Sequence, residues 1–223
     1  MKMGSPDYER AATKAAETLV KYKILTMPVM PLLILKQLPN TVFLSYAEIS
    51  HRSHMDRTDL LSMMGDANHD ALTYVDLESG PEPLYIVAYN QRLPYYMIQR
   101  ALARELGHIV LGHDGSRPEE VRNEEAKAFA YHLLCPRGLI SALRDFGVPI
   151  TVEVLGTITG CYERCLAGMR KMPGVHVPAD LNRRVKSQVS LYLESFLPFQ
   201  KYLSESDESA MVDFGTYMDF YEE

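Results

Sequence analysis

Residues 102–113 read LARELGHIVLGH, and this stretch decides how the chain is interpreted. Its apolar residues recur every three or four positions, which predicts one face of a helix. Within it, residues 104–108 match the zinc-binding helix motif H-E-x-x-H, except that Arg104 stands at the first histidine position. In the intact motif, two histidines four apart reach one zinc ion from one helix face, and the glutamate acts as general base. The stretch therefore predicts a metallopeptidase-type helix with one ligand position altered.

Arg104 changes the chemistry that this motif would otherwise predict. A guanidinium has five hydrogen-bond donors and no acceptor, and it remains charged at any physiological pH. It cannot ligate zinc, and its charge opposes a dication nearby. Glu105 and His108 keep the positions of the general base and of the second histidine. The motif thus predicts the framework of a zinc site and leaves its metal content open.

A second helix after the motif supplies a candidate for a further ligand. Residues 124–130 read EEAKAFA and begin about 16 residues after His108, beyond a turn that contains glycine. This spacing allows a helical hairpin to bring a carboxylate over the motif helix. Zinc peptidases take a third protein ligand from elsewhere in the fold and keep the fourth position open.

The second helix continues as EAKAFAYHLLCP over residues 125–136. This stretch and residues 102–113 together resemble the two active-site helices of the ImmA/IrrE family of metallopeptidase-like proteins. Residues 27–29 and 85–90 are similar to that family's entry region and to the strand before its active helix. The resemblance covers roughly residues 8–175 and rests on two linked motifs in the family's order.

The resemblance implies a small zincin-like domain of mobile elements, phages and stress regulons. Such proteins often cleave or inactivate a partner, so a protein partner such as a helix-turn-helix transcriptional repressor is implied here. Carried over by position, Glu105 would be the general base, and His108 and Glu125 would be zinc ligands. Arg104 departs from the family's pattern at a ligand position.

Three interpretations of Arg104 stay open from the sequence. In the first, the protein is a degenerate zincin without catalytic zinc, and the guanidinium pairs with Glu125 in place of the metal. In the second, a metal is kept by another ligand, for which His113, Glu124 and His132 are nearest in sequence. His113 is otherwise expected to cap or pack at the end of the motif helix. In the third, the chain is altered or engineered.

The order of elements predicts the α+β class: a zincin-like domain with a small β-sheet and a helical C-terminal extension. Residues 1–175 form the expected zincin domain, followed by a C-terminal helix over 176–203 and an acidic tail over 204–223. A capping box is expected at the start of the second site helix, with Ser116 as N-cap and Glu119 at the third helical position. The expected helices are 5–22, a short one after Pro31, 94–111, 117–134, 138–146, 151–159, 161–171 and 181–200, and the expected strands are 41–46, 72–77 and 84–89.

Composition and charge exclude several classes. The chain has 223 residues, of which 47% are hydrophobic and 23% charged, so it can bury a core. The net charge is −6, but the tail carries seven acidic residues and no basic one, which leaves the first 203 residues at +1. A near-neutral body argues against a dominant nucleic-acid surface. No stretch reads as a signal peptide or membrane span, and three cysteines give no disulfide framework, so a cytoplasmic location is expected.

Two segments outside the motif suggest further roles. Residues 151–171 could form a helix-turn-helix with its turn at Gly160, but their basic residues form no phosphate-binding stripe, so direct nucleic-acid binding is not favoured. Residues 204–223 place an apolar stripe on an acidic background, which suits either a disordered tail or a docking segment. An acidic peptide of this kind could occupy the cleft beside Arg104.

Two main functions therefore compete. In a zinc endopeptidase, Glu105 would activate a metal-bound water, with His108, Glu125 and a substitute ligand holding the metal. In a binding module, the cleft would hold a peptide of a partner protein without cutting it. A DNA-binding regulator acting through residues 151–171 is the weaker alternative. The oligomeric state cannot be derived from the sequence.

Overall fold

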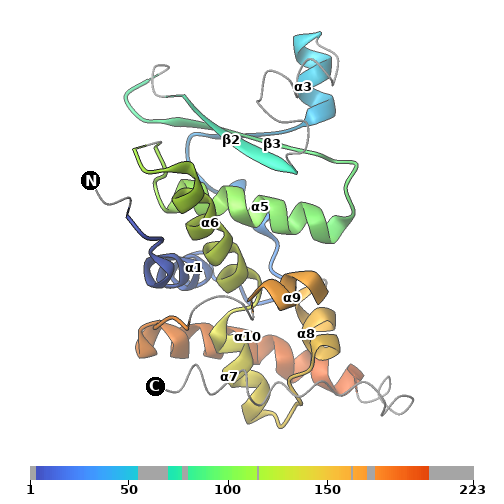
Figure 1. Cartoon of the computed structure of the whole chain (residues 1–223). Coiled ribbons are helices and arrows are strands. Elements are labelled where there is room, and N and C mark those ends of the chain that lie inside the picture. The colour runs from blue at the N-terminus through green and yellow to red at the C-terminus, as the bar shows by residue number, and fades with distance from the viewer. Residues whose placement is uncertain are drawn as a thin grey trace. The chain divides into compact units, whose positions relative to one another are not determined.

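The computed structural model describes residues 4–54, 70–76, 80–114, 116–161, 163–169 and 174–200. It is an α+β protein with a three-stranded sheet and a long C-terminal helix, which confirms the expected fold class (Figure 1). The elements are α1 (Tyr8–Lys21), α2 (Pro31–Leu35), β1 (Thr41–Ser45), α3 (Tyr46–Ser53), β2 (Ala71–Asp76), β3 (Leu84–Tyr89), α5 (Tyr95–Val110), α6 (Glu119–Leu134), α7 (Arg137–Asp145), α8 (Val152–Thr159), α9 (Glu163–Met169) and α10 (Ala179–Gln200).

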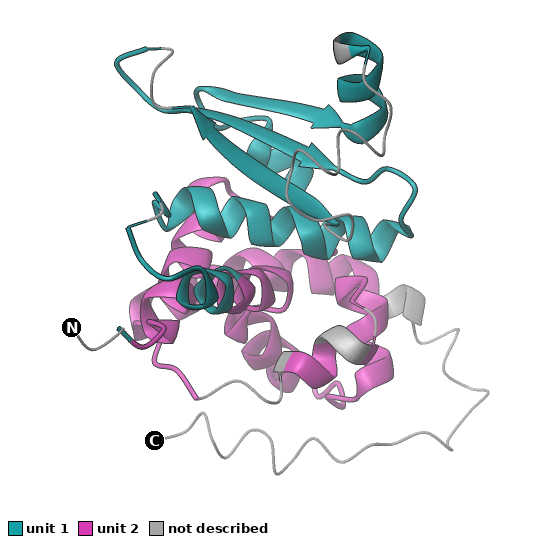
Figure 2. Ribbon diagram, turned by 45° about the horizontal axis from the view of Figure 1, so that its top comes forward, with its two compact units in different colours: residues 1–4, 30–126 teal, residues 5–29, 127–223 magenta. Residues whose placement is uncertain are grey.

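The chain divides into two compact units, coloured separately in Figure 2. Unit 1 comprises residues 1–4 and 30–126, and it contains the sheet and the motif helix α5. Unit 2 comprises residues 5–29 and 127–223. Helix α6 begins in unit 1 and continues into unit 2. The expected boundary between residues 175 and 176 therefore does not coincide with the division into compact units.

The sheet of unit 1 has the order β1-β3-β2. β1 pairs with β3 in parallel, and β2 pairs with β3 in antiparallel orientation, with Thr73 opposite Val87. Successive side chains of a strand point to opposite faces. Tyr74 is accordingly exposed, whereas Thr73 and Val75 point to the other face. That face meets α5, which packs against β2 and β3 (Figure 1).

The apolar face of helix α5 is buried. Leu102 and Leu106, four positions apart, are fully buried, and Ala103 between them is buried as well. Ala103 and Gly107, which have small or no side chains, are also buried. The helix ends at Val110, and Gly112 then takes a φ of 65°, a conformation that glycine adopts without steric cost. The expected motif helix is thus confirmed to within one residue at each end.

Helix α6 ends where the sequence predicts but begins later. It starts at Glu119, so the expected capping box from Ser116 is wrong. The backbone N–H of Ser116 donates instead to Oδ1 of Asp114 at 2.9 Å, a local turn that keeps Ser116 outside the helix. The chain between α5 and α6 is therefore a longer loop than predicted.

Unit 2 is helical in its described residues. α10 packs on α7 and also contacts α1, whose first turn is capped by the Asp7 side chain accepting from the N–H of Arg10. Gly138 of α7 lies so close to α10 that an added Cβ would come within 2.7 Å of the Lys186 backbone nitrogen. No helix in the described part of the chain is long and apolar enough to cross a membrane. Residues 204–223, the predicted tail, lie outside the described residues.

Candidate active site

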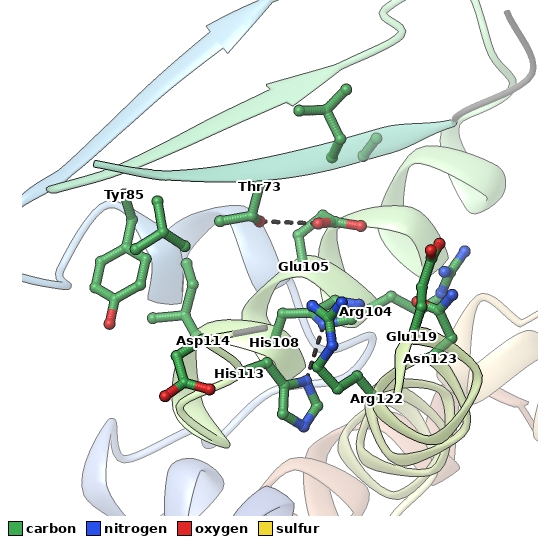
Figure 3. A pocket seen from close by; sticks show the side chains of 14 residues that line it. Thr73, Tyr85, Arg104, Glu105, His108, His113, Asp114, Glu119, Arg122 and Asn123 are labelled. Atoms are coloured by element: carbon green, nitrogen blue, oxygen red, sulfur yellow. Dashed lines mark hydrogen bonds between the residues drawn. The ribbon is translucent and has the colours of Figure 1, made fainter. Parts of the chain in front are cut away.

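A pocket of about 340 Å³ lies in unit 1 between β2 and the helices α5 and α6. β2 contributes Thr73 and its neighbours, and α5 contributes three motif residues (Figure 3). The lining residues are Ala71, Leu72, Thr73, Val75, Tyr85, Arg104, Glu105, His108, Ile109, His113, Asp114, Glu119, Arg122 and Asn123. The motif helix therefore presents its candidate catalytic face to a pocket.

Glu105, the predicted general base, lies at the base of this pocket. Its side chain is 5% exposed, and the Thr73 hydroxyl donates a hydrogen bond of 2.8 Å to Oε2 (Figure 3). Thr73 sits on β2 directly above α5, because alternate residues of the strand face the helix. A nearly buried carboxylate needs such donors, since an unpaired buried charge is unfavourable by several kcal/mol, on the order of 5.

His108, His113 and Glu125 form a chain of contacts beside the pocket. Nδ1 of His113 lies 2.9 Å from Nδ1 of His108, and Nε2 of His113 lies 3.1 Å from Oε2 of Glu125. The other oxygen of Glu125 accepts a hydrogen bond of 2.5 Å from Nη1 of Arg117. Glu125 is only 1% exposed, so protein groups, Arg117 and His113 among them, compensate its charge in place of water.

This arrangement does not fit the zinc ligand set that the family resemblance implies. Zinc ligands place their donor atoms about 2.0–2.3 Å from one shared point. Here His113 uses opposite ring nitrogens for His108 and for Glu125, so these two contacts do not converge on one point. Within the described residues, no group of three or more His, Cys, Asp or Glu side chains is arranged to hold a metal ion.

Arg104 lines the pocket but does not pair with Glu125 as the sequence suggested. The guanidinium that binds Glu125 is that of Arg117, in the loop before α6, so the expected kind of contact is present with a different arginine. In the part of the chain that the structure describes, the Arg104 side chain makes no hydrogen bond or ion pair.

Two guanidiniums act on His108. Burial, together with the neighbouring His113, Arg104 and Arg122, lowers the pKa of His108 to about 3. The His108 imidazole is therefore neutral at physiological pH. Arg122 is held in place by a hydrogen bond of 3.0 Å from its Nε to the carbonyl oxygen of Arg117. The pocket around His108 is consequently flanked by two positive charges.

The remaining predicted site residues lie elsewhere. Glu124 precedes Glu125 on α6, is half-buried and does not line the pocket. His132 lies two turns further along α6, in unit 2, and is buried at 7% exposure. The structure thus brings Glu105, His108, His113 and Glu125 together and leaves Glu124 and His132 outside this cluster.

Acid is expected to destabilise unit 2 through His132. Burial, and secondarily the charge of Arg137, lowers the pKa of His132 from about 6.5 to about 4. The unfolded chain therefore binds a proton near pH 6.5 that the folded state excludes, and stability falls as the pH drops from about 6.5 to about 4. The loss amounts to roughly 3 kcal/mol at most. Urea unfolding at pH 7 and pH 5 should show a smaller difference for His132→Gln than for the wild type.

Exposed histidines provide the control for this measurement. His176 lies outside the helices and is exposed, so His176→Gln serves as the matched histidine-to-glutamine control. If the free energy of unfolding changes by the same amount between pH 7 and pH 5 in the wild type and in His132→Gln, His132 does not have this role.

The sequence did not single out the two arginines and the threonine that complete the site. Arg117 and Arg122 follow the motif in a polar loop and helix, where arginine is ordinarily solvated. Thr73 lies 32 residues before Glu105, and only the packing of β2 on α5 brings them together. The His113 position carried a signal, because it lies five residues after His108, just beyond the end of the same helix.

The motif helix, the small sheet packed on it and the buried Glu105 define a metallopeptidase-related domain. The family model for the IrrE N-terminal-like domain, Peptidase M78, matches residues 57–150. This match confirms the ImmA/IrrE resemblance that the two helix motifs indicate. Comparisons with curated proteins and with solved structures find no match.

Proposed function

We propose that this protein is an ImmA/IrrE-related binding protein whose cleft holds a segment of a partner protein without zinc-dependent cleavage. The observation that carries the proposal is the contact chain from His108 through His113 to Glu125 and Arg117. These contacts use both ring nitrogens of His113 and both oxygens of Glu125, and Arg104 stands at the remaining ligand position. His108, His113 and Glu125, which would be the metal ligands, therefore contact one another instead.

The pocket supports the binding of an extended peptide. It is bordered by β2, an outer strand of the three-stranded sheet that the structure describes. An outer strand can accept an added strand through main-chain hydrogen bonds, and adjacent pockets then select side chains. The partner class we propose is a transcriptional repressor of a mobile element or stress regulon, in keeping with the family resemblance. The cell compartment we propose is the cytoplasm.

A second candidate function is an active zinc endopeptidase in which His113 replaces the missing histidine. It is favoured by the position of His113 within 2.9 Å of His108 and 3.1 Å of Glu125. This function requires the His113 imidazole to rotate. A single ring nitrogen would then have to point at a metal ion shared with His108 and Glu125. It also requires Arg117 to release Glu125. DNA binding through residues 151–171 stays a prediction, because part of that segment lies outside the described residues.

Metal analysis distinguishes the first two functions. The protein, purified without chelator and dialysed, should contain well under one zinc per chain by mass spectrometry of the metal. Its binding to an array of end-capped nonapeptides should be unaffected by the chelator dipicolinate and by Glu105→Gln. Stoichiometric zinc that survives dialysis, together with peptide hydrolysis that Glu105→Gln abolishes, would establish the endopeptidase instead.

A further inference from the structure

The pocket has two guanidiniums among its lining groups. Arg104 and Arg122 both line it, and both lie close enough to His108 for their charges to act on its imidazole. A zinc site gathers groups that attract a cation. Each guanidinium repels a cation and attracts an anion at close range, and three carboxylates, Glu105, Asp114 and Glu119, line the same pocket.

The N–H donors of the Arg104 guanidinium are available to bind such an anion. Within the described residues its guanidinium makes no hydrogen bond or ion pair, although it is only partly exposed in the pocket wall. A guanidinium offers paired N–H donors whose geometry matches the two oxygens of a carboxylate. Arg122 is oriented by its own Nε contact to the Arg117 carbonyl, which leaves its terminal nitrogens for a second contact.

None of the three carboxylates that also line the pocket forms an ion pair with Arg104 in the described structure. Glu105 accepts from Thr73 at 2.8 Å, and Asp114 accepts from the N–H of Ser116 at 2.9 Å. Glu119 is exposed at the first position of α6, and no ion pair joins it to Arg104 in the described structure. Figure 3 shows Thr73 and Glu105 at the sheet side of the pocket, and His108 and His113 at the opposite side.

We infer that the pocket is a carboxylate-binding site in which Arg104, assisted by Arg122, receives an acidic group of the partner peptide. The inference rests on the proposed function, since it names the chemical feature of the segment that the cleft selects. Arg104, at the first ligand position of the motif, is then a specificity-determining residue. The carboxylate can belong to an Asp or Glu side chain or to a chain end, and both offer the same two oxygens.

A peptide array with matched acidic and amide residues tests the inference. Nonapeptides with capped ends carry Glu or Gln at the central position within randomised flanks, and a second set ends in a free or an amidated C-terminus. The wild type is expected to retain Glu peptides about tenfold more tightly than Gln peptides, or free ends more tightly than amidated ones. Arg104→Gln should abolish the preference and Arg104→Lys should retain part of it. Arg92→Gln, which removes an exposed arginine outside the pocket, should not change it.

A second measurement separates this inference from the proposed function. Acetate is titrated against the ¹⁵N-labelled protein, with acetamide as the neutral control, and the Nε–H signal of Arg104 is followed. Peptides that bind without any acidic preference, with no acetate-dependent shift, would overturn the carboxylate site and leave peptide binding intact. An acetate-dependent shift of Arg104 without binding of any peptide would support the carboxylate site and overturn the proposed function.

Discussion

Arg104→His alone is expected to bind zinc weakly, and Arg104→His combined with Arg117→Ser is expected to bind it roughly 10- to 100-fold more tightly. The single change restores an imidazole at the first ligand position of the motif. It leaves Arg117 on Oε1 of Glu125 at 2.5 Å, so the third ligand remains paired with a cation. Removing this guanidinium frees one carboxylate oxygen and takes away a positive charge that opposes the metal. Competition with a chromogenic chelator measures both affinities.

Two comparisons make this expectation decisive. Arg92→His adds a histidine in an exposed loop and should bring no zinc affinity, with or without Arg117→Ser. If Arg104→His alone binds zinc as tightly as the double variant, Arg117 does not obstruct the site and the identity of residue 104 is the whole explanation. Peptide hydrolysis by the double variant, absent after a further Glu105→Gln change, would show that Glu105 still has the position of a general base.

The fold was largely predictable because its elements carry local signals. The strands at 41–45 and 84–89 are rich in β-branched and aromatic residues, and α5 shows helical periodicity with buried Leu102 and Leu106. α3 was not predicted, although Ser45 and Glu48 form a capping box that the sequence pattern S-x-x-E would have indicated. The parallel pairing of β1 with β3 depends on contacts far apart in sequence, which periodicity does not encode.

The site was predictable only as far as the motifs reach. Glu105, His108 and Glu125 follow from helical spacing, and their proximity was expected from the family resemblance. The cation on Glu125 could not be assigned, since both Arg104 and Arg117 are long enough in principle and a loop conformation decides between them. That loop begins at Gly112, whose positive φ turns the chain so that His113 lies against His108. Side-chain pairing across a loop depends on such backbone details.

Loss of Arg117 is expected to be among the most destabilising single changes in unit 1. Arg117→Met removes the guanidinium from the Glu125 carboxylate, whose side chain is 1% exposed, and should lower the free energy of unfolding by roughly 2–4 kcal/mol. In a Glu125→Gln background, which has no charge to compensate, the same change should lower it by less than about 1 kcal/mol. Urea unfolding of the four proteins in this cycle gives the coupling energy directly.

The pair Arg100–Asp70 provides the matched control within the same unit. It is a salt bridge of 3.2 Å whose side chains are 39% and 23% exposed, so its coupling energy should be below about 1 kcal/mol. A similar small value for Arg117 and Glu125 would mean that water, rather than the guanidinium, compensates the buried carboxylate. A large value would mean that Arg117 stabilises the buried Glu125 carboxylate, because burial makes that carboxylate unfavourable without a partner.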